Sequence, residues 1–214
     1  MMVPKPTFFD SRACDWEESC YPEPVRARLR ELIEGFGVMP GERVLDVGTG
    51  PGVLIPYLRS LAGASGRICA FDLSLEMVKQ ANRKERASGD IIIRADVHRI
   101  PFDDNAFDRV ICLAAFPHFH NPGQAVYEMA RVLKPKGELI IAHLMSREEL
   151  TRHHGEHEAV ARDVLPDDRR MTSFFLEAML SPPKITDRPG QYLAKGSKRR
   201  SILKIKRTVP FSYF

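Results

Sequence analysis

The stretch VLDVGTGPG, residues 44–52, determines the expected fold, because a strand-like apolar run leads directly into glycines at positions 48, 50 and 52. Glycine has no Cβ, so the backbone can approach a ligand where a side chain would clash. Ligands of open parallel sheets bind at the carboxyl ends of the strands, where this turn would lie. A dinucleotide-binding turn has the spacing G-x-G-x-x-G, and the third glycine position is Val53 here. The turn therefore predicts a ligand site of a different kind.

Acidic residues mark the ends of three successive strand-like runs. Asp46 lies two residues before Gly48, where its carboxylate would repel a pyrophosphate but suit an ammonium group. Asp72 lies twenty residues after Gly52, where an acid commonly accepts hydrogen bonds from ribose hydroxyls. Asp96 ends the run DIIIRAD, where a carboxylate can accept from the exocyclic amine of adenine. Any one of these acids could be a helix cap, but together they predict an adenosine with a cationic amino-acid tail.

Strand-like and helix-like segments alternate along the chain, which predicts a parallel sheet covered by helices. Helices are expected after the glycine turn, through about residue 61, after Ser74 as N-cap, and after Pro122. A turn at residues 134–137 separates the last of these helices from the fifth strand. The expected strands are 42–48, 66–73, 90–96, 107–116 and a fifth that ends at residue 144.

The flanking segments predict a cap and a terminal hairpin. Residues 8–36 carry a helical apolar stripe of Val25, Leu29, Leu32 and Ile33, which suits a lid over the sheet. Residues 145–182 form a connection that contains a polar, His-rich stretch followed by an amphipathic segment. Residues 184–196 surround Pro189-Gly190 and predict a hairpin.

Length and composition exclude several classes of protein. The chain has 214 residues, 43% hydrophobic and 28% charged, which favours one α/β domain rather than a disordered chain. No apolar run approaches the roughly 18 residues of a membrane span, and the N-terminus MMVPKPTFFDSR has no signal core. The four cysteines match no zinc spacing, which indicates a reduced protein. We therefore expect a cytoplasmic location.

The positive charge is concentrated at the C-terminus. The formal net charge is +4, but residues 195–214 hold seven basic residues and no acid, so residues 1–194 carry a net charge of −3. The basic tail, residues 197–214, is typical of an anionic-surface contact or of a poorly ordered terminus, and we expect the latter.

Taken together, these motifs resemble the class I S-adenosylmethionine-dependent methyltransferases, the broad group that includes the ubiquinone/menaquinone-type enzymes. The resemblance covers about residues 8–196, and FFDSRACDWEE is similar to the family's N-terminal lid segment. It implies a Rossmann-like α/β fold: a seven-stranded, mostly parallel sheet with an antiparallel last strand, helices on both faces, and an N-terminal helical lid. We expect a single methyltransferase domain, residues 1–196, with a cofactor-binding core at 42–144. The matching pieces are VLDVGTGPG, FDLS, ADVHRIPF, FDRVICLAAFPHF and RVLKPKGELIIAHL.

The resemblance implies S-adenosyl-L-methionine as cofactor. It places the glycine turn and Asp46 around the methionine moiety, Asp72 on the ribose and Asp96 near the adenine amine. Leu73 and Val97 would pack on the purine, and Leu113 would face the methionine part. The implied reaction is in-line displacement of the sulfonium methyl by a substrate nucleophile. The implied cofactor-binding residues are Asp46, Gly48, Thr49, Gly50, Gly52, Asp72, Leu73, Asp96, Val97 and Leu113.

Histidines dominate the segments expected beside the methyl acceptor. One interpretation makes His118 or His143 a general base or an acceptor-positioning residue. Another is a divalent transition metal or metal-chelate site, because His153 and His157 have the i, i+4 spacing of zinc ligands on a helix. The metal set would comprise His143, His153, His154 and His157, with His118 nearby.

A third interpretation is a binding protein that holds the cofactor without transferring a methyl group. We expect a small-molecule acceptor, because the body of the chain is acidic and no nucleic-acid-binding module is evident. The expected assembly is a monomer or a homodimer.

Overall fold

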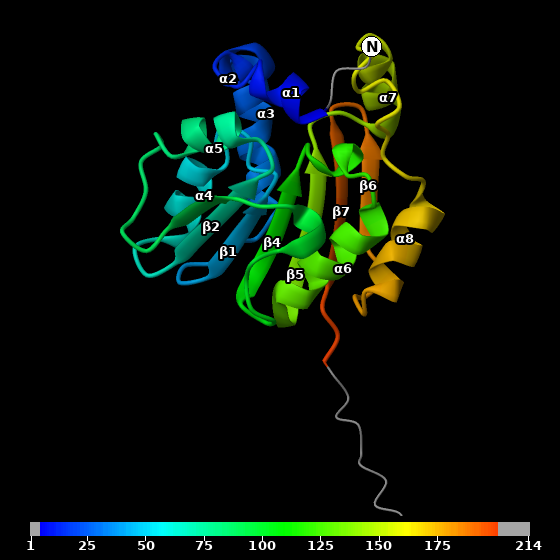
Figure 1. Cartoon of the computed structure of the whole chain (residues 1–214). Coiled ribbons are helices and arrows are strands. Elements are labelled where there is room, and N and C mark those ends of the chain that lie inside the picture. Colours follow the sequence, from blue (N-terminus) through cyan, green and yellow to red (C-terminus); the bar gives the residue numbers. More distant parts are fainter. Residues whose placement is uncertain (1–4, 201–214) are drawn as a thin grey trace, which may run out of the picture.

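A computed structural model describes residues 5–200 and contains one sheet of seven strands (Figure 1). Across the sheet the strands follow the order β3-β2-β1-β4-β5-β7-β6. The first five pair in parallel, whereas β7 runs antiparallel to both β5 and β6. The seven-stranded sheet with an antiparallel last strand is therefore confirmed. The strands are β1 Arg43–Val47, β2 Arg67–Asp72, β3 Ile91–Arg94, β4 Phe107–Leu113, β5 Leu133–His143, β6 Lys184–Arg188 and β7 Gln191–Ser197.

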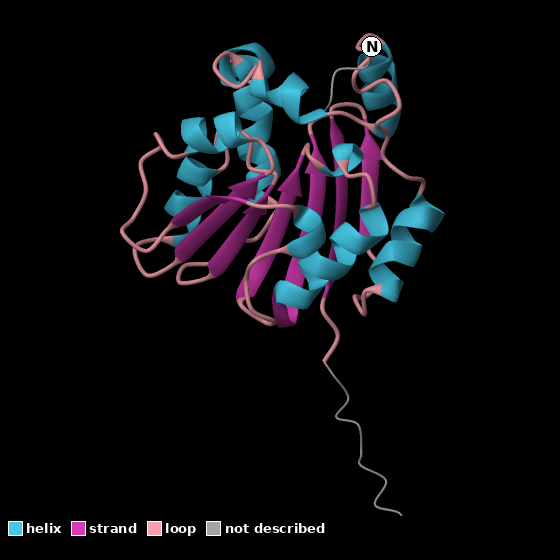
Figure 2. Cartoon of the chain, in the orientation of Figure 1, coloured by secondary structure: helices cyan, strands magenta, loops and turns pink. Residues whose placement is uncertain are grey.

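Helices cover both faces of the sheet (Figure 2). Helices α6 and α8 pack on one face, and α3, α4 and α5 pack on the other. None of the helices within residues 5–200 has both the length and the apolar character needed to cross a membrane. The helices are α1 Lys5–Asp10, α2 Trp16–Cys20, α3 Glu23–Glu34, α4 Ile55–Ala62, α5 Leu75–Ala81, α6 Pro122–Val132, α7 Arg147–Gly155 and α8 Asp168–Glu177.

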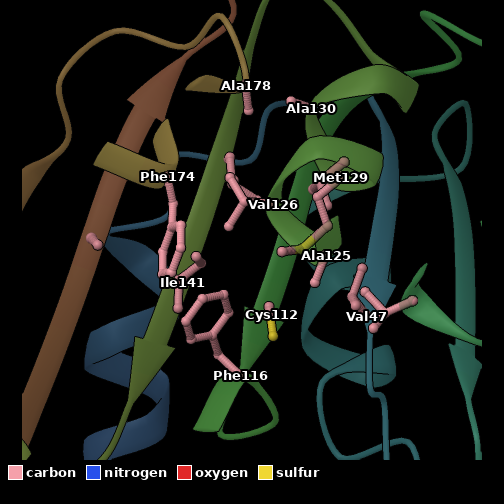
Figure 3. Packing of buried hydrophobic residues seen from close by; sticks show 14 of the residues in the cluster. Val47, Cys112, Phe116, Ala125, Val126, Met129, Ala130, Ile141, Phe174 and Ala178 are labelled. Carbon is pink, nitrogen blue, oxygen red and sulfur yellow. The ribbon is translucent and has the colours of Figure 1, made fainter. Parts of the chain in front are cut away.

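The continuous apolar runs of the central strands form strands that are buried on both faces. In β5, Ile140 packs with α3 and α4, whereas the next residue, Ile141, packs with α6 and α8. Figure 3 shows the second of these layers, with Val126 and Met129 of α6 beside Cys112 and Ile141 of the sheet. Alternate side chains therefore bind the two helical layers to one sheet.

The strand order reverses at β1, which lies between β2 and β4. Ligands of open α/β sheets bind in the crevice at such a switch point. In Figure 1, α1, α2 and α7 all lie at the end of the sheet toward which the parallel strands point. The fold therefore brings three helices around the carboxyl end of β1.

Two strand boundaries differ by more than two residues from those expected. The fourth strand ends at Leu113 rather than at residue 116, because Ala114 has a φ of 59° and turns the chain into a short 3-10 helix, Phe116–His118. Residues 134–137, expected as a turn, belong to β5, where Lys136 has a φ of 71° and the register with β4 shifts. The first change matters for the site, because the 3-10 helix that replaces the end of the strand carries His118.

The His-rich stretch folds into helix α7. Ser146 and Glu149 form a capping box, in which the Ser146 hydroxyl accepts from the Glu149 amide and the Glu149 carboxylate accepts from the Ser146 amide. Such a box satisfies amide groups that the first turn leaves unpaired. The predicted hairpin is also present as β6 and β7. The part of the basic tail from residue 201 onward lies outside the described residues.

Candidate functional site

A cavity of about 950 Å³ opens at the carboxyl ends of the strands. It is lined by the glycine turn, by residues at and after the ends of β1, β2, β4 and β5, and by helices α1, α2 and α7. Small-molecule sites have volumes of roughly 300 to 1,000 Å³, so this cavity is at the upper end of the range. It can therefore hold a cofactor and a second small molecule side by side.

The glycine turn after β1 uses its glycines for two different purposes. At Gly48, φ is 67° and an added Cβ would lie 2.4 Å from the Cβ of Ala115, whereas at Gly50, φ is 55° and an added Cβ would meet nothing within 4 Å. Gly50 therefore presents bare backbone toward the cavity. Gly52 does not line the cavity, and its missing Cβ makes room for Ala81 of α5 at 3.1 Å. The structure thus gives Gly52 a role in helix packing, and the cofactor contact that the resemblance implied stays a prediction.

Asp46 is a buried carboxylic acid beside the turn, with 1% of its surface exposed. Its Oδ2 accepts a hydrogen bond of 2.6 Å from the Thr49 hydroxyl. Burial raises the pKa of Asp46 to about 7; the Thr49 hydrogen bond opposes the rise and the nearby Asp72 adds to it. Burial disfavours the ionised form of this carboxyl group, and a nearby cation would stabilise that form. Asp46 therefore suits an ammonium or sulfonium group.

Asp72, at the end of β2, connects the glycine turn to the start of α5. Its Oδ2 accepts from the Gly50 amide and its Oδ1 from the Ser74 amide, both at 2.9 Å. Burial raises its pKa, although these backbone hydrogen bonds oppose the rise. Ser74 caps α5 as predicted, and its hydroxyl also donates to Asp10 of α1. The lid helix therefore closes directly over the predicted ribose position.

Asp96 lies beyond the end of β3, where it caps the 3-10 helix Val97–Arg99. It accepts from the His98 amide at 2.9 Å and from the His98 ring at 2.6 Å. Partial burial favours a higher pKa, but the His98 hydrogen bonds outweigh it and hold the pKa of Asp96 below its usual value. Leu73, Val97 and Leu113 line the same cavity. All the predicted cofactor residues except Gly52 therefore meet in one space.

His118 makes the most informative contact at the other end of the cavity. Its Nδ1 lies 2.7 Å from Oδ2 of Asp163, a carboxylate with 6% of its surface exposed. Sequence reasoning missed Asp163, which lies in the loop between α7 and α8 and is separated from His118 by 45 positions. No local pattern marks it. A carboxylate that accepts from Nδ1–H directs proton exchange to Nε2, as a general base requires.

Two further histidines line this end of the cavity. His154 places its Nδ1 2.5 Å from the main-chain oxygen of Asp163, and its ring centroid is 5.2 Å from that of His118. His143 accepts a hydrogen bond from the Met145 amide at Nδ1, and burial lowers its pKa to about 3. A ring with so low a pKa does not take up a proton near neutrality. Of the two roles expected for His143, its surroundings thus favour acceptor positioning over general-base catalysis.

The structure does not support the metal site expected at His143, His153, His154 and His157. The residues do share the cavity, and His153 and His157 have ring centroids 5.5 Å apart. However, residues 5–200 contain no group of three or more His, Cys, Asp or Glu side chains arranged to hold a metal ion. At His143 the reason is local: its Nδ1 accepts from the Met145 amide, so in the neutral ring the other nitrogen, Nε2, carries the proton and offers no lone pair to a metal.

Aromatic residues of the lid cover the His118 end of the cavity. The Phe9 ring meets His118 edge to face at a centroid distance of 5.0 Å and meets Trp16 at 5.5 Å. Glu17 of α2 pairs with Lys84, beyond α5, and with Arg26 of α3. These ion pairs connect α2 to α3 and to the segment after α5, and the Phe9 and Trp16 rings form an apolar wall of the cavity.

Comparison with known families gives a consistent result. Residues 45–141 match the family described as "Methyltransferase domain". A demethylmenaquinone methyltransferase of Renibacterium salmoninarum is 39% identical over 53% of this chain and 46% of its own length. The ubiquinone/menaquinone biosynthesis C-methyltransferase UbiE of Pseudomonas paraeruginosa is 35% identical over 52% of this chain and 45% of its own. The chain thus spans less than half the length of these curated relatives.

Solved structures share the fold over most of the chain. A SAM-dependent methyltransferase from Aquifex aeolicus superposes with a TM-score of 0.71 at 22% identity, covering 88% of this chain and 97% of its own. The structures confirm the expected fold, and the match of residues 45–141 to the methyltransferase-domain family agrees with the resemblance stated from the sequence motifs.

Proposed function

We propose that this chain, whose residues 45–141 belong to the methyltransferase-domain family, transfers a methyl group from S-adenosyl-L-methionine to a small molecule in the same cavity. One observation carries the proposal. A single cavity joins the glycine turn and three strand-end carboxylates to the His118–Asp163 pair. The first end suits the cofactor, and the second end suits an acceptor that must lose a proton.

The residues at the first end fit this cofactor. Gly50 offers backbone without a side chain, and Asp46 offers a buried acid to the cationic methionine part. We assign Asp72 to the ribose hydroxyls and Asp96 to the adenine amine, and both side chains line the same cavity. The cofactor supplies an activated methyl group, so the protein contributes mainly by positioning the acceptor and excluding water. The lid formed by α1 and α2 supports both roles.

The acceptor end favours a ring-bearing compound. Phe9 and Trp16 provide an aromatic wall beside His118. The sequence similarity to ubiquinone/menaquinone and demethylmenaquinone methyltransferases also favours an acceptor of quinone type. His118, oriented by Asp163, is the residue that we assign as general base.

Isothermal calorimetry of S-adenosylmethionine binding tests the cofactor site. We expect wild-type protein to bind the cofactor. Asp72→Ala should bind it at least about tenfold more weakly, because hydrogen bonds to a buried carboxylate are lost. Asp103→Ala, at an exposed position, should bind like wild type. Formation of S-adenosylhomocysteine with a panel of hydroxyl, amine and thiol compounds then tests transfer. Wild-type protein that binds no cofactor would refute the proposal.

A further inference from the structure

We propose that His98 positions the Asp96 carboxylate for the exocyclic amine of adenine, and that this gives the site a preference for a 6-aminopurine over a 6-oxopurine. The inference rests on the proposed function, because it concerns the cofactor that is assigned there to this cavity. It adds a positioning residue, His98, which acts through the carboxylate.

Two hydrogen bonds from His98 converge on one oxygen of Asp96. The Oδ1 atom accepts from the His98 amide at 2.9 Å and lies 2.6 Å from Nδ1 of the His98 ring. An ionised carboxylate can only accept, so Nδ1 carries the proton of this second bond. Partial burial favours a higher pKa of Asp96, but the two hydrogen bonds outweigh it and keep the group ionised near neutrality.

The His98 ring is itself held by several neighbours. Its Nε2 accepts from the Asn121 amide at 3.3 Å. The His120 ring lies against it with the centroids 3.8 Å apart, and Phe119 meets it edge to face at 6.3 Å. Only 14% of the His98 side chain is exposed. A ring fixed in this way restrains the carboxylate to which it donates.

The second oxygen of Asp96 is open to the cavity. Within residues 5–200, Oδ2 of Asp96 has no hydrogen-bond partner in the protein. The Asp96 side chain is 47% exposed and lines the cavity together with Leu73 and Val97. Leu73 is itself 47% exposed, which leaves apolar surface for a purine ring to cover. These features suit a flat base that carries an N–H donor on its edge.

The group at position 6 of the purine decides whether this oxygen finds a partner. Adenine has an amine there, and the amine donates to a carboxylate oxygen. Hypoxanthine has a carbonyl oxygen there, which cannot donate and would face the negative charge. A site with a polar group placed for a hydrogen bond rejects a ligand that leaves that group unpaired.

His98 contributes by reducing the freedom of the carboxylate. Without the Nδ1–H bond, Asp96 keeps only the backbone donor, and binding of the amine must then also restrict the rotation of the side chain. This cost falls on an adenine-bearing ligand, which uses the carboxylate, and not on a hypoxanthine-bearing ligand. Loss of the His98 ring nitrogens should therefore weaken only the first kind of ligand.

Calorimetry with S-adenosylhomocysteine and S-inosylhomocysteine on the full-length protein tests this inference. We expect wild-type protein to bind S-adenosylhomocysteine at least about tenfold more tightly than the inosine analogue. His98→Phe keeps a ring against His120 but has no ring nitrogen, and should weaken S-adenosylhomocysteine about fivefold while leaving S-inosylhomocysteine unchanged. His98→Asn, whose amide can donate from the position of Nδ1, should keep most of the preference. Arg99→Gln, at an exposed neighbour outside the cavity, should bind both ligands like wild type.

A double-mutant cycle shows whether His98 acts through Asp96. Asp96→Ala should remove the preference by itself, and adding His98→Phe to it should change neither affinity further. If His98→Phe does not fold, His98→Ala gives the same readout.

The outcomes separate this inference from the proposed function. Wild-type protein that does not bind S-adenosylhomocysteine refutes the proposed function. Normal binding in wild type refutes this inference alone if His98→Phe weakens both ligands equally or leaves the preference unchanged. A full effect of His98→Phe in the Asp96→Ala background also refutes it.

Discussion

Replacing Asp46 with Asn should remove most of the pH dependence of stability that the cofactor end of the cavity imposes. The acid has a pKa of about 7 in the folded protein because it is buried, against an ordinary value of 3.8. Between these values the folded chain holds a proton that the unfolded chain releases, so the free energy of unfolding falls as pH rises from about 4 to about 7. Above pH 7 the loss is complete.

The expected magnitude follows from the same two pKa values. Between pH 5 and pH 8, wild-type protein should lose about 3 kcal/mol of stability through Asp46 alone. Asp72 adds a loss of the same sign, since its pKa is also raised by burial. Asp46→Asn should reduce the fall by about 3 kcal/mol, because an amide does not titrate and can still accept from Thr49.

Urea denaturation at several pH values measures this effect in ligand-free protein. Asp103→Asn is the control, because this exposed aspartate lies outside the cavity and its replacement should leave the pH dependence of stability unchanged. The buried histidines His143 and His154, whose pKa values are lowered, act with the opposite sign in both proteins, so the difference between wild type and Asp46→Asn is the quantity to measure. Equal changes of stability between pH 5 and pH 8 in the two proteins would refute the reasoning.

The same acid predicts proton release on cofactor binding. A cationic ligand stabilises the ionised carboxylate, so binding at pH 6 should release about 0.9 proton from Asp46, and binding at pH 8.5 almost none. Calorimetry in buffers of different ionisation enthalpy measures this number. Release that is as large at pH 8.5 as at pH 6, or as large in Asp46→Asn as in wild type, would assign the proton to another group.

Three further predictions concern the glycine turn, helix α7 and the lid. Gly48→Ala should lower the free energy of unfolding by at least about 2 kcal/mol, because the new Cβ meets Ala115. Gly50→Ala should lower it by about 1 kcal/mol, because only the positive φ is unfavourable there. Equal losses of the two variants in chemical denaturation would contradict this prediction. Ser146→Ala should lower the free energy of unfolding by about 1 kcal/mol, because the capping box of α7 is lost. Thermal unfolding measures this change, and an unchanged midpoint would mean that the cap contributes nothing. Glu17→Gln should accelerate amide hydrogen exchange in residues 8–21, because it weakens the ion pairs of Glu17 with Lys84 and Arg26. Glu23→Gln, which changes an exposed ion pair with Arg30, should leave this exchange unaltered.

The sequence by itself was sufficient for the sheet and for the cofactor end of the cavity. Strand runs buried on both faces are continuous in the chain, and parallel strands carry their carboxyl ends to one edge. Asp46, Asp72 and Asp96 could therefore be placed together from their positions alone. The exception is Gly52, whose spacing suggested a ligand contact but whose missing Cβ makes room for Ala81.

The acceptor end was decided by tertiary structure. The histidines were visible in the sequence, but their hydrogen-bond partners are distant in the chain or belong to the backbone. His118 pairs with Asp163 across 45 positions, and His143 bonds to a main-chain amide. No periodicity predicts such contacts, because a hydrogen bond depends on the three-dimensional placement of two atoms. The sequence thus predicted the cofactor end of the cavity, and only the folded chain determined which hydrogen-bond partners the histidines have.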